Sequence, residues 1–197
     1  MRGAQVEFLE VGPRDGLQNE KTLIATADKL ELVRRAIAAG VRRIEVTSFV
    51  NPKRVPQMAD AEDVCAGLPR HDDVTYVGLV MNARGAERAI ATGRIDQLGA
   101  VSVATDRFAV ANQGQDSDGS VDAAIEIVGM ARVAGLKGGG QATIAAAFGC
   151  PYEGEVAEDR VLAMARRLAT AGPAEVVLAD TIGVADPAQV SRLVASV

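Results

Sequence analysis

The chain opens with Val6-Glu7-Phe8-Leu9-Glu10-Val11-Gly12-Pro13-Arg14-Asp15-Gly16, an apolar run that leads into a turn bearing a cation and a carboxylate. The apolar residues predict a buried strand over residues 5–10, and the Gly-Pro pair and Gly16 predict a turn at its carboxyl end. In parallel α/β folds the chemistry takes place at this end of the strands. Arg14 and Asp15 are therefore candidates for a metal site beside a developing negative charge, although a surface ion pair in a loop would have the same sequence.

Composition narrows the classes of function. Of the 197 residues 48% are hydrophobic, which is enough for the core of one domain. Asp and Glu number 26 against 21 Lys and Arg, aromatic residues make up 3%, and Trp is absent. We expect no nucleic-acid partner, because the chain offers neither a positive field nor stacking side chains. We also expect no membrane partner, because the apolar runs are shorter than the roughly 20 residues of a membrane helix.

The cysteines and the first residues bear on the compartment. Cys65 and Cys150 have neither a zinc-site spacing nor a disulfide framework. Met1 to Ala4 lead directly into the predicted strand, which leaves no room for a signal peptide. These features predict a protein of the reducing cytoplasm.

Strand-like and helix-like segments alternate along the chain, as is typical of a parallel α/β fold. The strand-like segments are rich in Val, Ile and Ala, as parallel strands covered on both faces are. They are residues 5–10, 43–47, 75–80, 97–103, 143–147 and 175–178. Amphipathic helical patterns cover residues 26–39, 60–67, 83–92, 121–134 and 157–171, and Asp186-Pro187 begins a last helix.

Two architectures fit this alternation, a doubly wound open sheet and a (β/α)8 TIM barrel. The predicted strand ends recur about every 33 residues, so eight units would need about 260 residues, close to the size of a TIM barrel. We expect a single catalytic TIM-barrel domain over residues 1–197 that holds about the first six βα units, a truncated barrel. No Gly-x-Gly-x-x-Gly motif follows a strand, and Gly138-Gly139-Gly140 predicts a flexible connection from helix to strand.

Polar side chains recur at or near the carboxyl ends of the predicted strands. Glu10 and Glu45 are flanked by Val or Ile, and an ionised carboxylate in a buried strand costs several kcal/mol unless it is paired or holds a metal. Asp180 follows the apolar run Val176–Ala179 and is a similar candidate. The further groups at strand ends are Gln18, Ser48, Asn51, Asn82, Thr105 and Asp106.

Four blocks of the sequence resemble the 3-hydroxy-3-methylglutaryl-CoA lyase family, in the order of that family. They are residues 6–21, residues 44–58, Phe148-Gly149-Cys150-Pro151-Tyr152-Glu153-Gly154 and Asp180-Thr181-Ile182-Gly183. The Arg-Asp-Gly core resembles a wider superfamily of metal-dependent acyl-CoA lyases and synthases, whereas the Cys-Pro-Tyr-Glu-Gly block is similar to the lyase branch. The resemblance implies a TIM barrel and a metal-dependent retro-Claisen cleavage of a 3-hydroxy-3-methylglutaryl-CoA-like thioester to acetyl-CoA and acetoacetate.

The resemblance also implies roles for individual residues. Arg14 would stabilise the enolate oxygen that forms when the carbon–carbon bond breaks. Asp15 would be a ligand of Mg²⁺ or Mn²⁺, which prefer carboxylate oxygen. Glu45 would orient Arg14 or a metal-bound water, and Asp180 would act in proton transfer at the substrate hydroxyl. Gln18 and Ser48 would be polar contacts around the metal and the substrate. Asn82 and Thr105, at the ends of predicted strands, are the further candidate substrate-binding residues. An acyl-CoA partner follows from the resemblance, and we expect a homodimer for the complete protein.

Some residues of the family pattern are not found in this chain. The family takes further metal ligands from a His-x-His and an Asn, and a proton donor from a Cys on a lid loop. We therefore expect the remaining metal ligands beyond Val197 and negligible turnover by this chain alone. His71 lies in a polar connection and is predicted to be a surface residue, and Cys150 is predicted to be structural.

The sequence leaves alternatives for the acyl group of the substrate and for the direction of the reaction. Thr143, Ala145 and Val177 stand where the well-known lyases carry Tyr, Ser and Ser, so a related 3-hydroxyacyl-CoA is an alternative substrate. A Claisen-type synthase on the same scaffold, and a binding module without catalytic activity, are the alternative functions.

Overall fold

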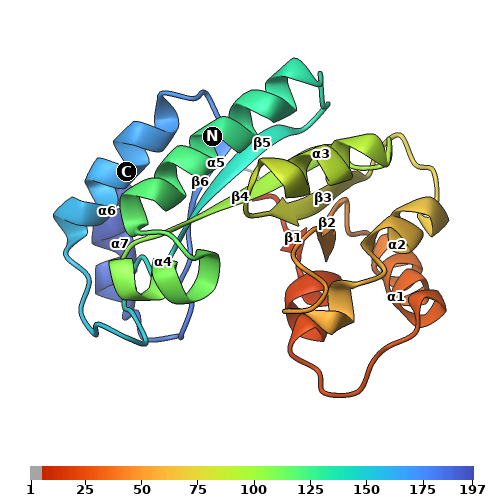
Figure 1. Ribbon diagram of the computed structural model, residues 1–197, viewed down its shortest axis with the longest axis horizontal. Coiled ribbons are helices and arrows are strands. Elements are labelled where there is room, and N and C mark those ends of the chain that lie inside the picture. The colour runs from red at the N-terminus through yellow and green to blue at the C-terminus, as the bar shows by residue number, and fades with distance from the viewer. Residues whose placement is uncertain (1–5) are drawn as a thin grey trace, which may run out of the picture.

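The computed structural model describes residues 6–197 as one six-stranded parallel sheet covered by helices (Figure 1). The strands, in their order across the sheet, are β1 (Leu9–Glu10), β2 (Arg43–Ser48), β3 (Thr75–Val80), β4 (Gln97–Val103), β5 (Gly139–Ala145) and β6 (Glu175–Leu178). The helices are α1 (Thr26–Ala38), α2 (Ala61–Gly67), α3 (Ala83–Ala91), α4 (Asp106–Gln113), α5 (Ser117–Val133), α6 (Glu158–Ala169) and α7 (Pro187–Ser196). Two shorter helical turns are η1 (Gly12–Gly16) and η2 (Pro56–Met58).

Strands that are neighbours in the sheet are also neighbours in the sequence, and every pair is parallel. A doubly wound sheet instead reverses its strand order at a switch point, so that alternative is wrong for this chain. Repeated right-handed crossovers in one direction place the helices outside and make the sheet curl. Figure 1 shows this curl, with α1 and α2 at one end of the arc and α6 and α7 at the other. The predicted architecture, six βα units of a TIM barrel, is confirmed.

A buried guanidinium crosses the inside of the curl. Arg43, at the start of β2, donates to Gln97 Oε1 at 2.7 Å from Nη2 and to Gln141 Oε1 at 3.1 Å, and it also contacts Glu175 at the start of β6. In a flat sheet, four strand spacings of about 4.8 Å would place β2 and β6 about 19 Å apart, beyond the reach of one side chain. The Arg43 contacts are therefore possible only because the sheet is curved.

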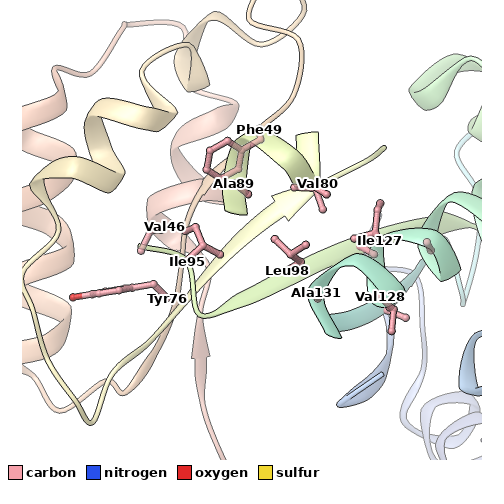
Figure 2. Close-up of a cluster of buried hydrophobic side chains, with 14 of the residues drawn as sticks. Val46, Phe49, Tyr76, Val80, Ala89, Ile95, Leu98, Ile127, Val128 and Ala131 are labelled. Carbon is pink, nitrogen blue, oxygen red and sulfur yellow. The ribbon is translucent and has the colours of Figure 1, made fainter. Parts of the chain in front are cut away.

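The hydrophobic core lies between the convex face of the sheet and the helices. Figure 2 shows part of it, where Val80 of β3 and Leu98 of β4 meet Ala89 of α3 and Ile127 and Val128 of α5. Each of these five residues is at most 2% exposed. Full burial of a Val, Leu or Ile side chain contributes about 1.5–3 kcal/mol to the free energy of folding. Within residues 6–197, no helix is long and apolar enough to cross a membrane.

The first strand is much shorter than predicted. Only Leu9 and Glu10 pair, with Arg43 and Ile44 of β2, and the side chains of Val6 and Phe8 are exposed. The prediction of a buried strand is therefore wrong for residues 6–8, while residue 5 lies outside the described residues. The reason is that β1 forms an edge of the described sheet, so it has one pairing partner instead of two.

Strand β5 begins earlier than predicted, at Gly139, and ends at Ala145. Gly139 and Gly140 pair with Gln97 and Leu98, so the prediction of a flexible connection is wrong for these two glycines. A Cβ at Gly140 would lie 2.9 Å from the Cα of Val128, so the glycine allows α5 to approach the sheet closely. Helix α4 and the first four residues of α5 were not predicted from the sequence.

Candidate active site

A cavity of about 560 Å³ opens on the concave side of the sheet, at the carboxyl ends of the strands. Its lining includes Arg14, Asp15, Gln18, Glu45 and Asp180, five of the eight site residues predicted from the sequence. These residues come from the turn after β1, from β2 and from the loop after β6. The fold therefore brings together side chains that are far apart in the sequence.

An ion pair between Arg14 and Glu45 lies at this cavity. Arg14 belongs to η1, a π-helical turn in which the Asp15 N–H donates to Val11 O at 2.7 Å. The Nε of Arg14 donates to Glu45 Oε1, and its Nη1 donates to Asp15 Oδ1 at 2.8 Å. The Asp15 side chain is 55% exposed, whereas that of Glu45 is only 5% exposed. One guanidinium thus joins a buried carboxylate to an exposed carboxylate.

Burial dominates the electrostatics of Glu45. Removal from water raises the pKa of Glu45, and the neighbouring Arg14 guanidinium acts against that rise. Among the described residues, no acceptor meets Nη2 of Arg14, which leaves this nitrogen available to an anion in the cavity. Glu10, the other carboxylate predicted to be buried, is only half-buried and accepts the Gly12 N–H at 2.6 Å. Glu10 therefore shapes the turn rather than the cavity.

Asp15 has the chemistry of a metal ligand. Arg14 engages one of its carboxylate oxygens, and the other lies at an exposed position. Mg²⁺ is usually bound through one or two carboxylates together with water and substrate oxygens, so Asp15 fits as one such ligand. Within residues 6–197, no group of three or more His, Cys, Asp or Glu side chains could hold a metal ion. This part of the chain therefore offers Asp15 without a complete ligand set.

A second cavity of about 570 Å³ adjoins the first, and both are lined by Gln18, Met81 and Asn112. Asn82 lines only the second cavity. Its Oδ1 accepts the Gly85 N–H at 2.9 Å and caps the first turn of α3. The structure therefore places Gln18 in the lining of the same cavity as Arg14, whereas Asn82 caps a helix and lines only the second cavity.

Two predicted substrate-binding residues, Ser48 and Thr105, line neither of these cavities. Ser48 is fully buried at the end of β2, and its Oγ has no hydrogen-bond partner among the described residues. Thr105 is also buried, and its Oγ1 lies 2.9 Å from the Sγ of Cys150. The position of Thr105 at a strand end is as predicted, but its hydroxyl packs on a cysteine instead of facing the cavity.

Asp180 is exposed at the cavity and is also part of the loop that follows β6. Its two carboxylate oxygens accept the N–H groups of Val184 and Ala185, both at 3.0 Å. The adjacent Thr181 accepts the N–H of Ala146 at 2.8 Å. Ala146 has a φ of 57°, the left-handed conformation that side chains disfavour. Thr181 therefore helps to hold a strained residue at the end of β5, next to Asp180.

Helix α4 contributes two cavity residues that were not predicted from the sequence, Phe108 and Asn112. The Oδ1 of Asn112 is buried and has no hydrogen-bond partner within residues 6–197, so a ligand group could satisfy it. The sequence carried a signal for this helix, because Gly114 ends it in the left-handed conformation typical of a helix terminus.

The Cys-Pro-Tyr-Glu-Gly block holds α4 in place. Glu153 Oε1 accepts the backbone N–H of Arg107 at 2.8 Å, and the backbone oxygen of Tyr152 accepts from the Arg107 side chain at 3.0 Å. The Tyr152 ring lies 5.6 Å from the ring of Phe108. This block therefore contacts the helix that bears Phe108 rather than entering the cavity itself.

Known proteins with similar sequences are acyl-CoA lyases. The profile of the family described as HMGL-like matches residues 5–197. The chain is 40% identical over 193 residues to the 3-hydroxy-3-isohexenylglutaryl-CoA/hydroxy-methylglutaryl-CoA lyase of Pseudomonas aeruginosa, an alignment that covers 98% of this chain and 63% of that protein. It is 37% identical over 193 residues to the mitochondrial hydroxymethylglutaryl-CoA lyase of Bos taurus, covering 98% of this chain and 58% of that protein.

Solved structures show the same fold. The lyase from Bacillus subtilis superposes with a TM-score of 0.92 at 38% identity, covering 98% of this chain and 63% of that chain. A lyase from Acinetobacter baumannii in complex with coenzyme A and 3-methylmalate superposes with a TM-score of 0.88 at 38% identity, covering 94% and 60%. The chain spans between 58% and 63% of the length of the two curated relatives. Because one family profile matches nearly the whole sequence, the chain belongs to the HMGL-like family.

Proposed function

We propose that this protein is a carbon–carbon lyase that cleaves 3-hydroxy-3-methylglutaryl-CoA, or a close 3-hydroxyacyl-CoA, to acetyl-CoA and a 3-oxo acid. The observation that carries the proposal is the Arg14 guanidinium, fixed by Glu45 at the cavity with Nη2 left without a protein acceptor in residues 6–197. The lyases named above, at 37% and 40% identity, support the same reaction.

The reaction breaks the bond between C2 and C3 of the acyl group. The electron pair of that bond passes to C2 and the thioester carbonyl, which gives an enolate. C2 then takes up a proton to give acetyl-CoA, which balances the proton that the C3 hydroxyl loses. Arg14 donates a hydrogen bond to the enolate oxygen, where the negative charge develops. Glu45 is almost fully buried in the cavity wall, and its role is to hold the guanidinium in one orientation.

Proton transfer at the tertiary hydroxyl requires an accessible base. Asp180 is the exposed carboxylate of the cavity on the β6 side, and the N–H groups of Val184 and Ala185 fix its orientation. Asp180 accepts the hydroxyl proton as the C3 carbonyl forms. The amides of Gln18 and Asn112, which line the cavity, would bind polar groups of the substrate.

Asp15 would hold a divalent metal, Mg²⁺ or Mn²⁺, with further ligands from outside residues 6–197 and from the substrate. Such a cation, when bound, polarises hydroxyl and carboxylate oxygens and lowers the pKa of the hydroxyl. The acyl-CoA partner, the homodimer of the complete protein and the cytoplasmic location remain predictions. The relatives include both a cytoplasmic and a mitochondrial lyase.

Release of acetoacetate from 3-hydroxy-3-methylglutaryl-CoA with Mn²⁺ tests the proposal, measured on the complete gene product and on residues 1–197 separately. We expect Arg14→Gln to lower kcat of the complete product by at least a thousandfold. The control is Arg42→Gln, which removes a surface ion pair with Asp73. Condensation of acetyl-CoA with a 2-oxo acid, without acetoacetate release, would instead favour the synthase alternative. Absence of both reactions and of Mn²⁺ binding would favour a binding module.

A further inference from the structure

Helix α4 supplies side chains to both cavities at the active site. Phe108 and Asn112 line the first cavity, and Ala111, Asn112 and Gln113 line the second. The groups proposed to act on the reacting bond come from other elements, the turn η1 and the loop after β6. A shift of α4 would therefore change the surface against which a ligand binds and leave the reacting groups where they are.

Burial does little to fix the position of α4. Among its eight residues, all in the described part of the chain, Ala109 is the one that is buried. Thr105 lies at the N-cap position but makes no side-chain hydrogen bond to the first turn. A helix this short is marginal without contacts from the rest of the molecule. The position of α4 therefore depends on the groups that contact its two ends.

The contacts at the amino-terminal end of α4 come from one hairpin, residues 150–154. Cys150 and Gly154 exchange backbone hydrogen bonds of 2.8 and 2.9 Å, and Gly154 has a φ of 77°. Glu153 Oε1 accepts the Arg107 N–H at 2.8 Å, one of the N–H groups of the first turn that a helix cannot pair by itself. A carboxylate is also favourable at a helix N-terminus. The hairpin thus supplies the cap that Thr105 does not.

The first turn of α4 joins this hairpin to the ligand-binding surface. The ring of Phe108, which lines the first cavity, lies 5.6 Å from the ring of Tyr152. None of residues 150–154 lines that cavity. The hairpin can therefore act on a ligand in the first cavity only through another element, and α4 is the element that it contacts.

We propose that Glu153 is a positioning residue for substrate binding. Its hydrogen bond to the Arg107 N–H fixes α4, and α4 in turn presents Phe108 and Asn112 to the acyl-CoA. This inference rests on the proposed function. It gives the Cys-Pro-Tyr-Glu-Gly block a role in binding, although the block itself lies outside the first cavity. A ligand that contacts α4 in this position should also stabilise the contact between Glu153 and the helix, because coupling between two sites is reciprocal.

Steady-state kinetics of the complete gene product, with 3-hydroxy-3-methylglutaryl-CoA and Mn²⁺, tests the inference. We expect Glu153→Ala to raise KM about tenfold, because a hydrogen bond to a charged group is lost. The kcat should stay within about twofold, because the reacting groups keep their positions. Glu153→Gln keeps an acceptor oxygen and should restore most of the affinity. The matched control, Glu155→Ala, removes an exposed carboxylate two positions away and should keep the wild-type KM. An unchanged KM in Glu153→Ala, or a fall in kcat alone, would overturn the inference.

A double-mutant cycle tests whether Glu153 acts through α4. Asn112→Leu removes an α4 group proposed to bind the substrate, so Glu153→Ala has less to disturb in that background. We expect Glu153→Ala to raise KM there by at most about threefold, instead of about tenfold. Full multiplication of the two effects would show that Glu153 does not act through Asn112 and would overturn the proposed route.

Hydrogen exchange and calorimetry report on the contact without turnover. The Arg107 amide should exchange about tenfold faster in Glu153→Ala than in the wild type. Adding the thioester with EDTA should slow this exchange in the wild type. Cleavage of the thioester, with neither KM nor exchange altered in Glu153→Ala, refutes the positioning role and leaves the lyase. Weaker calorimetric binding by Glu153→Ala in EDTA, without cleavage by the wild type, refutes the lyase and leaves the positioning role.

Discussion

The Nε of Arg14 donates to Oε1 of Glu45, which joins the turn after β1 to the buried side of β2. Glu45 is almost fully buried in the cavity wall, and its hydrogen bond to Arg14 fixes the orientation of the guanidinium. Hydrogen bonds to charged groups are worth about 1.5–3 kcal/mol, which corresponds to roughly tenfold to more than a hundredfold in rate.

Substitution of Glu45 tests this arrangement. Glu45→Gln keeps an acceptor oxygen for Arg14, so we expect kcat for acetoacetate release to fall about tenfold. Glu45→Leu leaves the guanidinium without this partner, and we expect a fall of a hundredfold or more. Steady-state kinetics on both variants checks the order. Equal activity of the Leu and Gln variants would contradict a positioning role for Glu45.

Asp15→Asn should weaken Mn²⁺ binding at least tenfold, because the neutral amide is a poorer ligand for a hard cation. Electron paramagnetic resonance titration of free Mn²⁺ measures this without turnover. Asp72→Asn removes an exposed carboxylate from a loop at the opposite end of the strands and is the control. The same affinity in the Asp15→Asn variant as in the wild type would remove Asp15 from the metal site.

Gln57 fixes the segment that follows the active-site turn. Its Oε1 accepts the Ile24 N–H and its Nε2 donates to Thr22 O, both at 2.9 Å. Gln57→Leu leaves both backbone groups unpaired, and we expect the free energy of unfolding in urea to fall by about 2–4 kcal/mol. Hydrogen exchange of the Ile24 amide should also become faster. In Tyr76→Phe, which loses one bond to Pro69 O, this exchange should keep its wild-type rate.

Burial raises the pKa of the Cys65 thiol to about 12. The folded state therefore holds the thiol proton more tightly than the unfolded state. Between pH 9 and pH 12 the unfolded chain loses this proton first, so the free energy of unfolding falls as pH rises, by at most about 1.4 kcal/mol per pH unit. Urea unfolding at pH 8.5 and pH 10 should show this fall in the wild type relative to Cys65→Ala. At pH 8.5 the native Cys65 should also resist alkylation by iodoacetamide. Rapid alkylation of Cys65 without unfolding would contradict its burial.

The parts of the fold that follow from continuous apolar runs could be predicted from the sequence. The bounds of β3, β4 and β6 are as predicted, because each is an uninterrupted strand-like run. The start of β5 could not be predicted in this way, because its glycines have low strand propensity and their pairing depends on β4. The pattern of α4 was missed because the helix is short and amphipathic only in part.

The members of the candidate site could be predicted where membership depends only on a residue's position near the carboxyl end of a strand. Arg14 and Glu45 belong to adjacent units, so their convergence follows from the strand order. The face of the sheet to which a side chain points is harder to predict, because a shift of one residue in the strand register turns the side chain to the other face. The pairing of β2 with β3 shifts between Glu45 and Thr47, and no feature of the sequence announces this. Thr105 shows the same limit, since its place after β4 was predicted but its contact with Cys150 was not.

The contacts that Arg43 of β2 makes with residues of β4, β5 and β6 have a consequence for how the chain folds. Its partners Gln97, Gln141 and Glu175 are 54, 98 and 132 positions later in the chain. We expect the contact with Glu175 to form only after β6 has docked, because contacts between residues far apart in the sequence form slowly, so the curvature would be completed late in folding. We expect Arg43→Met to accelerate unfolding much more than it slows refolding in stopped-flow experiments. The shape of the active-site cavity would then depend on the Arg43 contacts at the opposite, amino-terminal end of the strands. These contacts would form after the six described strands have paired.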